Sequence, residues 1–534
     1  MLRLTEIRLP LDHAGNALHG AILAKLGVEA SVLRGFTVFR RAVDARRKSA
    51  IMLIYTIDAD VADETALLVR FAADRHICRT PDLAYKPVTT RTAPKRRPLV
   101  IGTGPCGIFA ALILVQYGLR PIILERGKTV RERTKDTWGL WRRGILQPES
   151  NVQFGEGGAG TFSDGKLYSQ INDPNHLGRK VLTEFVTAGA PKEILYVAHP
   201  HIGTFRLVGM VEAMRATIER LGGEYRFGTR VTDLDIGIAG GARRVRGVVL
   251  ENGETIEADH VVLAVGHSAR DTFAMLKDRG VHIEKKPFSV GFRIEHPQSL
   301  IDRARYGGFA GNPILGAADY KLVHHAANGR SVYSFCMCPG GTVVAATSEP
   351  GRVVTNGMSQ YSRNERNANA GIVVGIEPAD YPGDVLAGID LQRDLESRAF
   401  VAGGGDYRAP GQLVGDFVVG RASTAFGAVI PSYKPGVTLT DLAPCLPDYA
   451  IAAIREALPA FGKRIPGFDR EDAVLTGVET RTSAPIRITR DRDGQSLNTR
   501  GLFPAGEGAG YAGGILSAGV DGIRAAEAVA RSLG

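Results

Sequence analysis

The chain has 534 residues, of which 23% are charged and 44% hydrophobic, as in an ordinary soluble globular protein. This length favours about three domains over a single core. The N-terminal MLRLTEIRLPLDH carries charges where a signal peptide needs an apolar core. Glycines and a proline interrupt the apolar run from Leu99 to Val115. We therefore expect a cytoplasmic protein with no membrane span.

Cysteine and charge further limit the class of protein. Five cysteines, at positions 78, 106, 336, 338 and 445, form no disulfide framework, which favours a reducing compartment. The net charge of +10 is uneven, because residues 1–98 hold 17 Lys and Arg against 10 Asp and Glu. Such a region indicates either an acidic partner such as nucleic acid or a solvated basic face. The sequence predicts no oligomeric state.

Residues 1–90 are predicted to form a small basic α/β domain of the ferredoxin-like kind. The hydrophobic pattern predicts strands over 2–11, 36–43 and 51–57 and helices over 16–26 and 63–78. Basic residues gather around the hairpin between the last two strands, where a partner would dock: Arg40, Arg41, Arg46, Arg47 and Lys48. Four prolines among residues 79–98 predict a linker.

The stretch RRPLVIGTGPCGIFAALILVQYGLRPIILERG, residues 96–127, reads as strand, glycine turn, helix and strand. Its Gly102, Gly104 and Gly107 form G-x-G-x-x-G, which permits a tight turn, close approach of a diphosphate and close helix packing. Glu125 follows the second strand, where a carboxylate can accept hydrogen bonds from an adenosine ribose. We predict an adenine dinucleotide here, with Pro105, Cys106 and Arg126 also in contact. The motif begins a Rossmann-like domain over residues 91–284.

A second glycine-rich segment, NVQFGEGGAGTFSDGKL, spans residues 151–167. Its backbone amides and hydroxyls are suited to a phosphate or a flavin edge, with Gly158, Gly160, Thr161 and Ser163 as candidates. A plain connector is the alternative. Further along, a strand is predicted over 225–235, and DHVVLAVG predicts a buried parallel strand that ends in a turn at Gly266. His199 and His201 have no third ligand nearby, so no metal site is predicted.

Frequent glycines and prolines from residue 285 to 469 predict an inserted α+β domain that contacts the substrate. Within it, Cys336 and Cys338 share one face of a predicted strand. Two interpretations are open: a redox pair beside a flavin, or two buried strand cysteines.

Residues 470–534 are predicted to return to the first domain. GLFPAGEGAGYAGGI reads as a strand, an acidic glycine turn at Gly506 and Glu507, and a helix from Gly514 and Ile515. This second helix N-terminus would hold a flavin edge through its amides. Together with the N-terminal motif, it favours FAD over NAD and a discontinuous binding domain.

These motifs resemble the uncharacterised FAD-dependent dehydrogenases of the two-dinucleotide-binding-domain, glutathione-reductase-like flavoproteins. The resemblance covers nearly the whole chain and is carried by GTGPCGIFAAL, GEGGAGTFSDGKL, PHIGT, SFCMCPGG, YKPGV, GVETRTSAPIRITR and PAGEGAGYAGGI. It implies that Glu507 contacts the diphosphate or ribityl region. It also implies that backbone near Gly514 and Ile515 approaches the flavin ring, and that Val231 contacts the adenine.

The expected function is that of an FAD-dependent dehydrogenase that transfers hydride between a small organic substrate and flavin N5. There is one G-x-G-x-x-G in a strand-to-helix setting, so NAD(P)H would bind only transiently. Arg481 is the first candidate for contact with an anionic substrate, with a structural ion pair as its alternative. Cys336, Cys338 and His201 follow as candidates. A flavin monooxygenase and a flavoprotein that docks RNA through its basic N-terminal domain are the other hypotheses.

Overall fold

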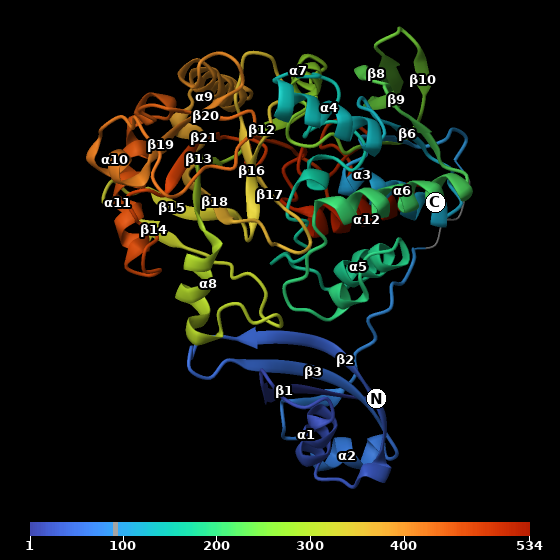
Figure 1. Cartoon of the computed structure of the whole chain (residues 1–534). Helices are drawn as coiled ribbons and strands as arrows, with labels where there is room; N and C mark the ends of the chain where they lie inside the picture. Colours follow the sequence, from blue (N-terminus) through green and yellow to red (C-terminus); the bar gives the residue numbers. More distant parts are fainter. Residues whose placement is uncertain (89–93, 534) are drawn as a thin grey trace.

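The structure is a computed structural model that describes residues 1–88 and 94–533. A small N-terminal sheet lies below a larger body in the view of Figure 1, and this body contains a five-stranded and a seven-stranded sheet. The last helix of the chain lies beside the helix of the first glycine motif, so the two ends of the larger body meet. None of the helices in the described part of the chain has the length and apolarity needed to cross a membrane.

The N-terminal sheet has the strand order β2-β3-β1-β4, with the helices between its strands in the sequence. Its elements are β1 (Leu2–Pro10), α1 (Ala17–Leu26), β2 (Leu33–Asp44), β3 (Met52–Val61), α2 (Glu64–Arg70) and β4 (Ile77–Arg79). The helix predicted over 63–78 is therefore too long. It ends early because Asp74 closes a turn by accepting from the backbone of His76, and Ile77 is then buried on the sheet.

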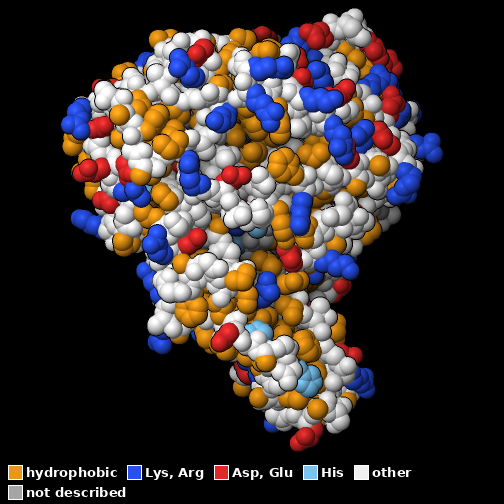
Figure 2. Space-filling model, viewed as in Figure 1, with side chains coloured by type: hydrophobic (Ala, Val, Ile, Leu, Met, Phe, Trp, Pro, Cys, Tyr) orange, Lys and Arg blue, Asp and Glu red, His pale blue; other side chains and the backbone are white. Residues whose placement is uncertain are grey.

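The basic hairpin of this sheet contacts its own chain. The backbone of Arg41 in β2 pairs with the segment Tyr196 to Ala198, and Lys48 at the hairpin tip lies against Gly307. Arg46 forms an ion pair with Asp44. On the face seen in Figure 2, Lys and Arg side chains are scattered over the larger body and are few on the N-terminal unit.

The five-stranded sheet is parallel throughout, in the order β23-β11-β5-β6-β7. Its strands are β5 (Leu99–Ile101), β6 (Ile122–Leu124), β7 (Glu224–Arg226), β11 (Val261–Leu263) and β23 (Leu502–Pro504). Helix α3 (Pro105–Gln116) is buried from Cys106 to Val115 because it lies between this sheet and α12 (Ile515–Ser532). A side chain at Gly522 of α12 would stand 2.2 Å from the Cys106 carbonyl oxygen, so this close packing requires glycine.

Other elements surround this sheet. Its helices are α4 (Val130–Arg143), α5 (Leu177–Thr187), α6 (Thr204–Arg220) and α7 (Arg270–Asp278). An antiparallel sheet contains β8 (Val231–Ala239), β9 (Ala242–Leu250) and β10 (Thr255–Glu257). The single strand predicted over 225–235 is divided, because Gly228 adopts a left-handed turn between β7 and β8.

The seven-stranded sheet has the order β14-β15-β18-β13-β21-β19-β20. Its strands are β13 (Phe288–Pro297), β14 (Val323–His325), β15 (Ser331–Cys338), β18 (Asn367–Ile376), β19 (Ala409–Leu413), β20 (Val437–Leu439) and β21 (Val474–Glu479). Helices α8 (Gln298–Tyr306), α9 (Ala387–Gly403), α10 (Val414–Val419) and α11 (Asp448–Gly462) pack around it, and β16 (Gly341–Ala345) pairs with β17 (Thr355–Ser359).

The sequence predicts that residues from 470 onward belong to the first domain, but strand β21 lies in the seven-stranded sheet. Its side chains are buried between β13 and β19, which it pairs with in antiparallel register. The chain returns toward the five-stranded sheet only at β22 (Ile486–Ile488), which pairs with β12 (Ile283–Lys285). The segment that leads into the seven-stranded sheet and the segment that leads back from it therefore lie side by side.

Candidate functional site

A cavity of about 380 Å³ lies between the carboxyl ends of the parallel strands and one end of the seven-stranded sheet. Most of the residues predicted from sequence line it. They are Gly102, Gly104, Pro105, Cys106, Glu125, Arg126, Gly158, Gly160, Ser163, Val231, Gly266, Cys336, Arg481, Gly506, Glu507, Gly514 and Ile515. Gly107, Thr161, His201 and Cys338 lie outside this lining.

Two helices begin at the cavity wall without a side-chain cap. Gly104 precedes α3 and Gly514 precedes α12, and neither helix has a capping hydrogen bond from a side chain. The first-turn amides of both helices are therefore available to an anion, as a dinucleotide diphosphate requires. A side chain at Gly266 or Gly513 would meet no protein atom within 4 Å, so these glycines keep space open along the cavity.

Gly107 and Thr161 have structural surroundings instead. A side chain at Gly107 would stand 1.9 Å from the Gly102 carbonyl oxygen, so this glycine serves the close packing of α3 on its turn. Thr161 is buried and lines a smaller neighbouring cavity between α3 and α6. Gly158, Gly160 and Ser163, the other candidates of the second glycine segment, do line the main cavity.

Glu125 is buried at the end of β6 and already has protein partners. One oxygen accepts from the Thr103 amide at 3.0 Å and from its hydroxyl at 2.5 Å. The other accepts from the amides of Gly127 and Gly155, at 2.8 and 3.0 Å. These four donors match the acceptor capacity of a carboxylate. A ribose hydroxyl therefore has to replace one of the donors or share an acceptor site with it.

His267 and Glu507 form a polar pair in the cavity wall. His267 Nδ1 lies 3.4 Å from Glu507 Oε2, and the buried Nε2 has no hydrogen-bond partner among the described residues. A buried, unpartnered ring nitrogen in a cavity wall is suited to a polar ligand atom. Sequence reasoning missed His267, although it directly follows the predicted strand and the turn at Gly266.

Lys166 brings a half-buried cation to the same cavity. Its ammonium group donates to the Met337 carbonyl and lies 3.7 Å from Asp164, whose carboxylate is paired with Arg363. Burial alone would lower the pKa of Lys166, but negative charge on the nearby Cys336 sulfur and on the Asp164 carboxylate outweighs it and raises the pKa above its usual range. Lys166 was also missed, although it stands in the quoted motif GEGGAGTFSDGKL.

The two cysteines of β15 differ in their placement. Cys336 is half-buried and lines the cavity, whereas Cys338 is fully buried behind it. The guanidinium of Arg293 donates to the Cys336 carbonyl at 2.9 Å and is itself paired with the buried Glu479. Both thiols are free.

His201 lies beside Lys166 but outside the cavity lining. Its Nε2 is 2.9 Å from the Tyr361 carbonyl oxygen, and its ring stacks on the Tyr361 ring. Burial, with the charge of Arg363, lowers the pKa of His201 to about 4. The imidazole is therefore neutral at physiological pH and is held as part of the structure.

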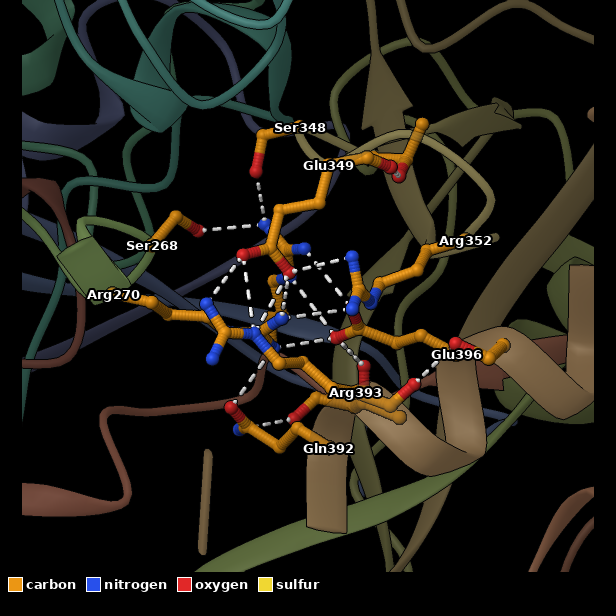
Figure 3. A network of polar contacts seen from close by, with 12 residues as sticks. Ser268, Arg270, Ser348, Glu349, Arg352, Gln392, Arg393 and Glu396 are labelled. Carbon is orange, nitrogen blue, oxygen red and sulfur yellow. Dashed lines mark hydrogen bonds and ion pairs between the residues drawn. The ribbon is translucent and has the colours of Figure 1, made fainter. Parts of the chain in front are cut away.

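Arg481 belongs to a buried network of ion pairs around Glu396. Figure 3 labels Arg270 and Glu396 within this network. Its Nε and Nη2 donate to both oxygens of Glu396, each at 3.1 Å, and its Nη1 donates to Ser268 and Ser348. Arg270 donates to the same carboxylate at 2.7 and 3.0 Å. Of the two interpretations of Arg481, this geometry favours the structural ion pair over an anion clamp.

The network keeps its carboxylates ionised. Burial alone would raise the pKa of Glu396, but the charges of Arg270 and Arg481 outweigh it and hold the pKa well below its usual range. Glu349, which pairs with Arg270 and Arg393, has its pKa lowered to about 2 because its arginine partners outweigh burial. Both carboxylates are therefore charged in the folded protein.

Among the described residues, no group of three or more His, Cys, Asp and Glu side chains is placed to hold a metal ion. The cavity supplies two uncapped helix ends, an open glycine path and hydrogen-bonding groups along its length. These features fit a dinucleotide cofactor.

Comparisons with known families agree with this geometry. Residues 177–305 match the family described as FAD dependent oxidoreductase, and residues 287–482 match that described as FAD-dependent protein, C-terminal domain-like. Residues 1–60 match a domain of unknown function. An "Uncharacterized protein" from Clostridium beijerinckii is 46% identical over 529 residues, covering 98% of each chain.

Solved structures resemble the chain more distantly. Glycine oxidase from Geobacillus kaustophilus is 12% identical, with a TM-score of 0.33, over 82% of this chain and 94% of that one. L-Amino acid deaminase from Proteus myxofaciens is 11% identical, with a TM-score of 0.33, over 84% and 93%. The chain belongs to the same family as the Clostridium beijerinckii protein, a family of FAD-dependent oxidoreductases, and its cofactor is FAD.

Proposed function

We propose that the protein is an FAD-dependent dehydrogenase that oxidises or reduces a small organic substrate at one end of this cavity. The observation that carries the proposal is the continuity of the cavity from the glycine turn before α3 to the uncapped start of α12 and on to Cys336 of β15. The cofactor supplies hydride transfer at flavin N5 when it is bound.

The orientation of the cofactor follows from the two helices. The AMP half would lie near Gly104, Glu125, Arg126 and Val231, which line the cavity around β6 and β8. The flavin would lie near Gly514 at the start of α12. Ile515 contacts the second glycine segment at Gly160, which connects this end to the wall that holds Lys166.

An anionic substrate suits the wall beyond the flavin. Lys166 lines the cavity, is half-buried and carries a positive charge, whereas the guanidinium of Arg481 is committed to Glu396. We therefore assign recognition of an anionic group to Lys166, with Arg481 holding the wall in place. NAD(P)H would enter the same space only transiently, as an alternative electron source.

We also propose how the chain is divided. Residues 1–90 form the N-terminal ferredoxin-like unit, and the Rossmann-like FAD-binding unit consists of residues 91–284 and a C-terminal part. The inserted substrate domain begins at residue 285. Because β21 belongs to the seven-stranded sheet, we place the end of the insertion near residue 482 rather than at 469.

Anaerobic stopped-flow spectroscopy tests the function directly. Full-length protein loaded with FAD is mixed with NADH, NADPH and a panel of amino, hydroxy and keto acids, and loss of flavin absorbance is recorded. We expect at least one organic anion to reduce the flavin. Lys166→Met should slow this reduction at least tenfold, whereas Lys86→Met, at an exposed ion pair with Asp82, should not.

Two results would contradict the proposal. Protein that cannot be loaded with FAD would exclude the cofactor site. Flavin reduced by NADPH alone, with oxygen then consumed in the presence of an organic substrate, would establish a monooxygenase instead.

A further inference from the structure

Strand β15 is bulged where it reaches the cavity. Its pairing with β18 steps from Phe335–Gly371 to Cys338–Asn369, so two residues of β15 stand opposite one residue of β18. Cys336 is the first of the two and has a left-handed φ of 42°, which is rare for a residue with a side chain. The bulge therefore holds Cys336 in a specific, locally strained position in the cavity wall.

The bulge also brings Cys338 close to Cys336. The Cys338 sulfur lies 3.3 Å from the Cys336 carbonyl oxygen, with no disulfide between the two residues. Of the other cysteines, Cys78 is exposed on the N-terminal unit, Cys445 is in the core of the seven-stranded sheet, and Cys106 lines the cavity singly from α3. Within the described chain, Cys336 is thus the cavity-lining thiol that has a second cysteine beside it.

The surroundings favour one thiolate and one thiol. A hydrogen bond from Cys338, aided by the positive charges of Lys166 and Arg293, lowers the pKa of Cys336. The same hydrogen bond and burial raise the pKa of Cys338. A thiolate beside a neutral thiol is the arrangement found in reactive dithiol pairs.

We propose that Cys336 and Cys338 are a dithiol/disulfide couple that exchanges two electrons with the bound flavin. This inference rests on the proposed function, because it requires the flavin to lie at this end of the cavity. In the oxidising direction the Cys336 thiolate and the Cys338 thiol form a sulfur–sulfur bond and release one proton. The two electrons and that proton pass to oxidised FAD, which leaves anionic reduced flavin, so atoms and charge balance.

Strain makes such a disulfide reversible. Neighbouring side chains of one strand are poorly placed for relaxed disulfide geometry. A strained disulfide has a more oxidising potential than a structural one and is easily reduced. The pair therefore suits electron storage rather than a permanent crosslink.

Reductive titration of the FAD-loaded, full-length protein tests the couple without turnover. Air-oxidised protein is titrated anaerobically with dithionite, then denatured and alkylated for mass spectrometry. We expect wild type to consume two electrons per flavin more than Cys336→Ser or Cys338→Ser. The peptide with both cysteines should be alkylated only after reduction. Cys445→Ser is the matched control for a buried thiol outside the pair and should titrate like wild type.

The outcomes separate this inference from the proposed function. If wild type consumes only the electrons of its flavin and both cysteines alkylate without reduction, the redox couple is excluded while FAD binding stands. If the protein binds no flavin but still forms the disulfide, the electron exchange with flavin is excluded. Flavin content and circular dichroism of each variant show whether a lost disulfide reflects misfolding.

Lys166 acts in this couple as a positioning residue. Lys166→Gln should shift the pH profile of Cys336 alkylation by iodoacetamide toward higher pH, because the thiolate loses its nearby cation. An unchanged profile would assign Lys166 to substrate recognition alone.

Discussion

At the scale of single residues, hydrogen-bond partners decide what a predicted side chain does. Glu125 is placed where the sequence predicts it, but its carboxylate also ties Thr103, Gly127 and Gly155 together at the cavity wall. Arg481 reaches the cavity, yet two hydrogen bonds to Glu396 hold its guanidinium. The chain position of each residue was predictable from a motif, whereas its partners come from distant segments.

Glu125→Ala should weaken FAD binding by about 10- to 100-fold, because hydrogen bonds to a charged group contribute about 1.5–3 kcal/mol. The loss combines the ribose contact with the loosened turns around the cavity. Fluorescence titration of apoprotein with FAD measures the affinity. Glu257→Ala, at an exposed ion pair with Arg96, is the control and should bind FAD normally. An unchanged affinity in Glu125→Ala would argue against the predicted role.

At the scale of elements, α3 shows that the glycines of one motif differ in what they require. Gly104 faces open space, with its nearest neighbour the Gly158 Cα at 3.8 Å from the site of an added side chain. Gly107 is pressed against the Gly102 carbonyl. The spacing of the motif predicted both the turn and the helix, because these glycines act through local backbone geometry.

These two glycines give a matched pair of substitutions. Gly104→Ala should leave the melting temperature of the apoprotein unchanged but weaken FAD binding at least tenfold, because its methyl group projects into the diphosphate path. Gly107→Ala should lower the stability of the apoprotein by about 1–3 kcal/mol through overpacking. Thermal unfolding and FAD titration of both variants measure the contrast. Equal effects of the two changes on binding and stability would refute it.

At the scale of the whole molecule, buried charges join the two sheets. Arg270 begins α7 beside the parallel sheet, Glu396 lies on α9, and Arg481 follows β21, so the network joins elements around both sheets. Figure 3 shows Arg270 and Glu396 with their neighbours. Removing one member leaves its partners buried and unpaired, which costs more than losing a surface ion pair.

Glu396→Gln should therefore destabilise the protein by about 3–5 kcal/mol. Asp394→Asn, at an exposed ion pair with Arg398 on the same helix, should cost less than about 1 kcal/mol. Differential scanning calorimetry compares the two variants. A similar loss for both would show that the buried network contributes no more than a surface pair.

The same network predicts a pH dependence. The pKa values of Glu349 and Glu396 are lower in the folded than in the unfolded chain, so the unfolded chain binds more protons in acid. Stability should be fully present above the ordinary carboxylate pKa and fall as the pH drops toward 2. In Glu396→Gln this acid-induced fall should be shallower. An identical slope in both proteins would contradict the assignment.

The sequence alone determined the parallel αβ sheet, its two glycine turns and the cofactor class, because these depend on short-range backbone geometry that residue type and spacing encode. Tertiary structure decided which side chains share the cavity. It brought Lys166 and His267 into the wall, left His201 and Cys338 outside it, and paired Arg481 with Glu396. It also placed β21 in the larger sheet. These outcomes depend on contacts between segments far apart in the chain, and hydrophobic periodicity carries no information about such partners.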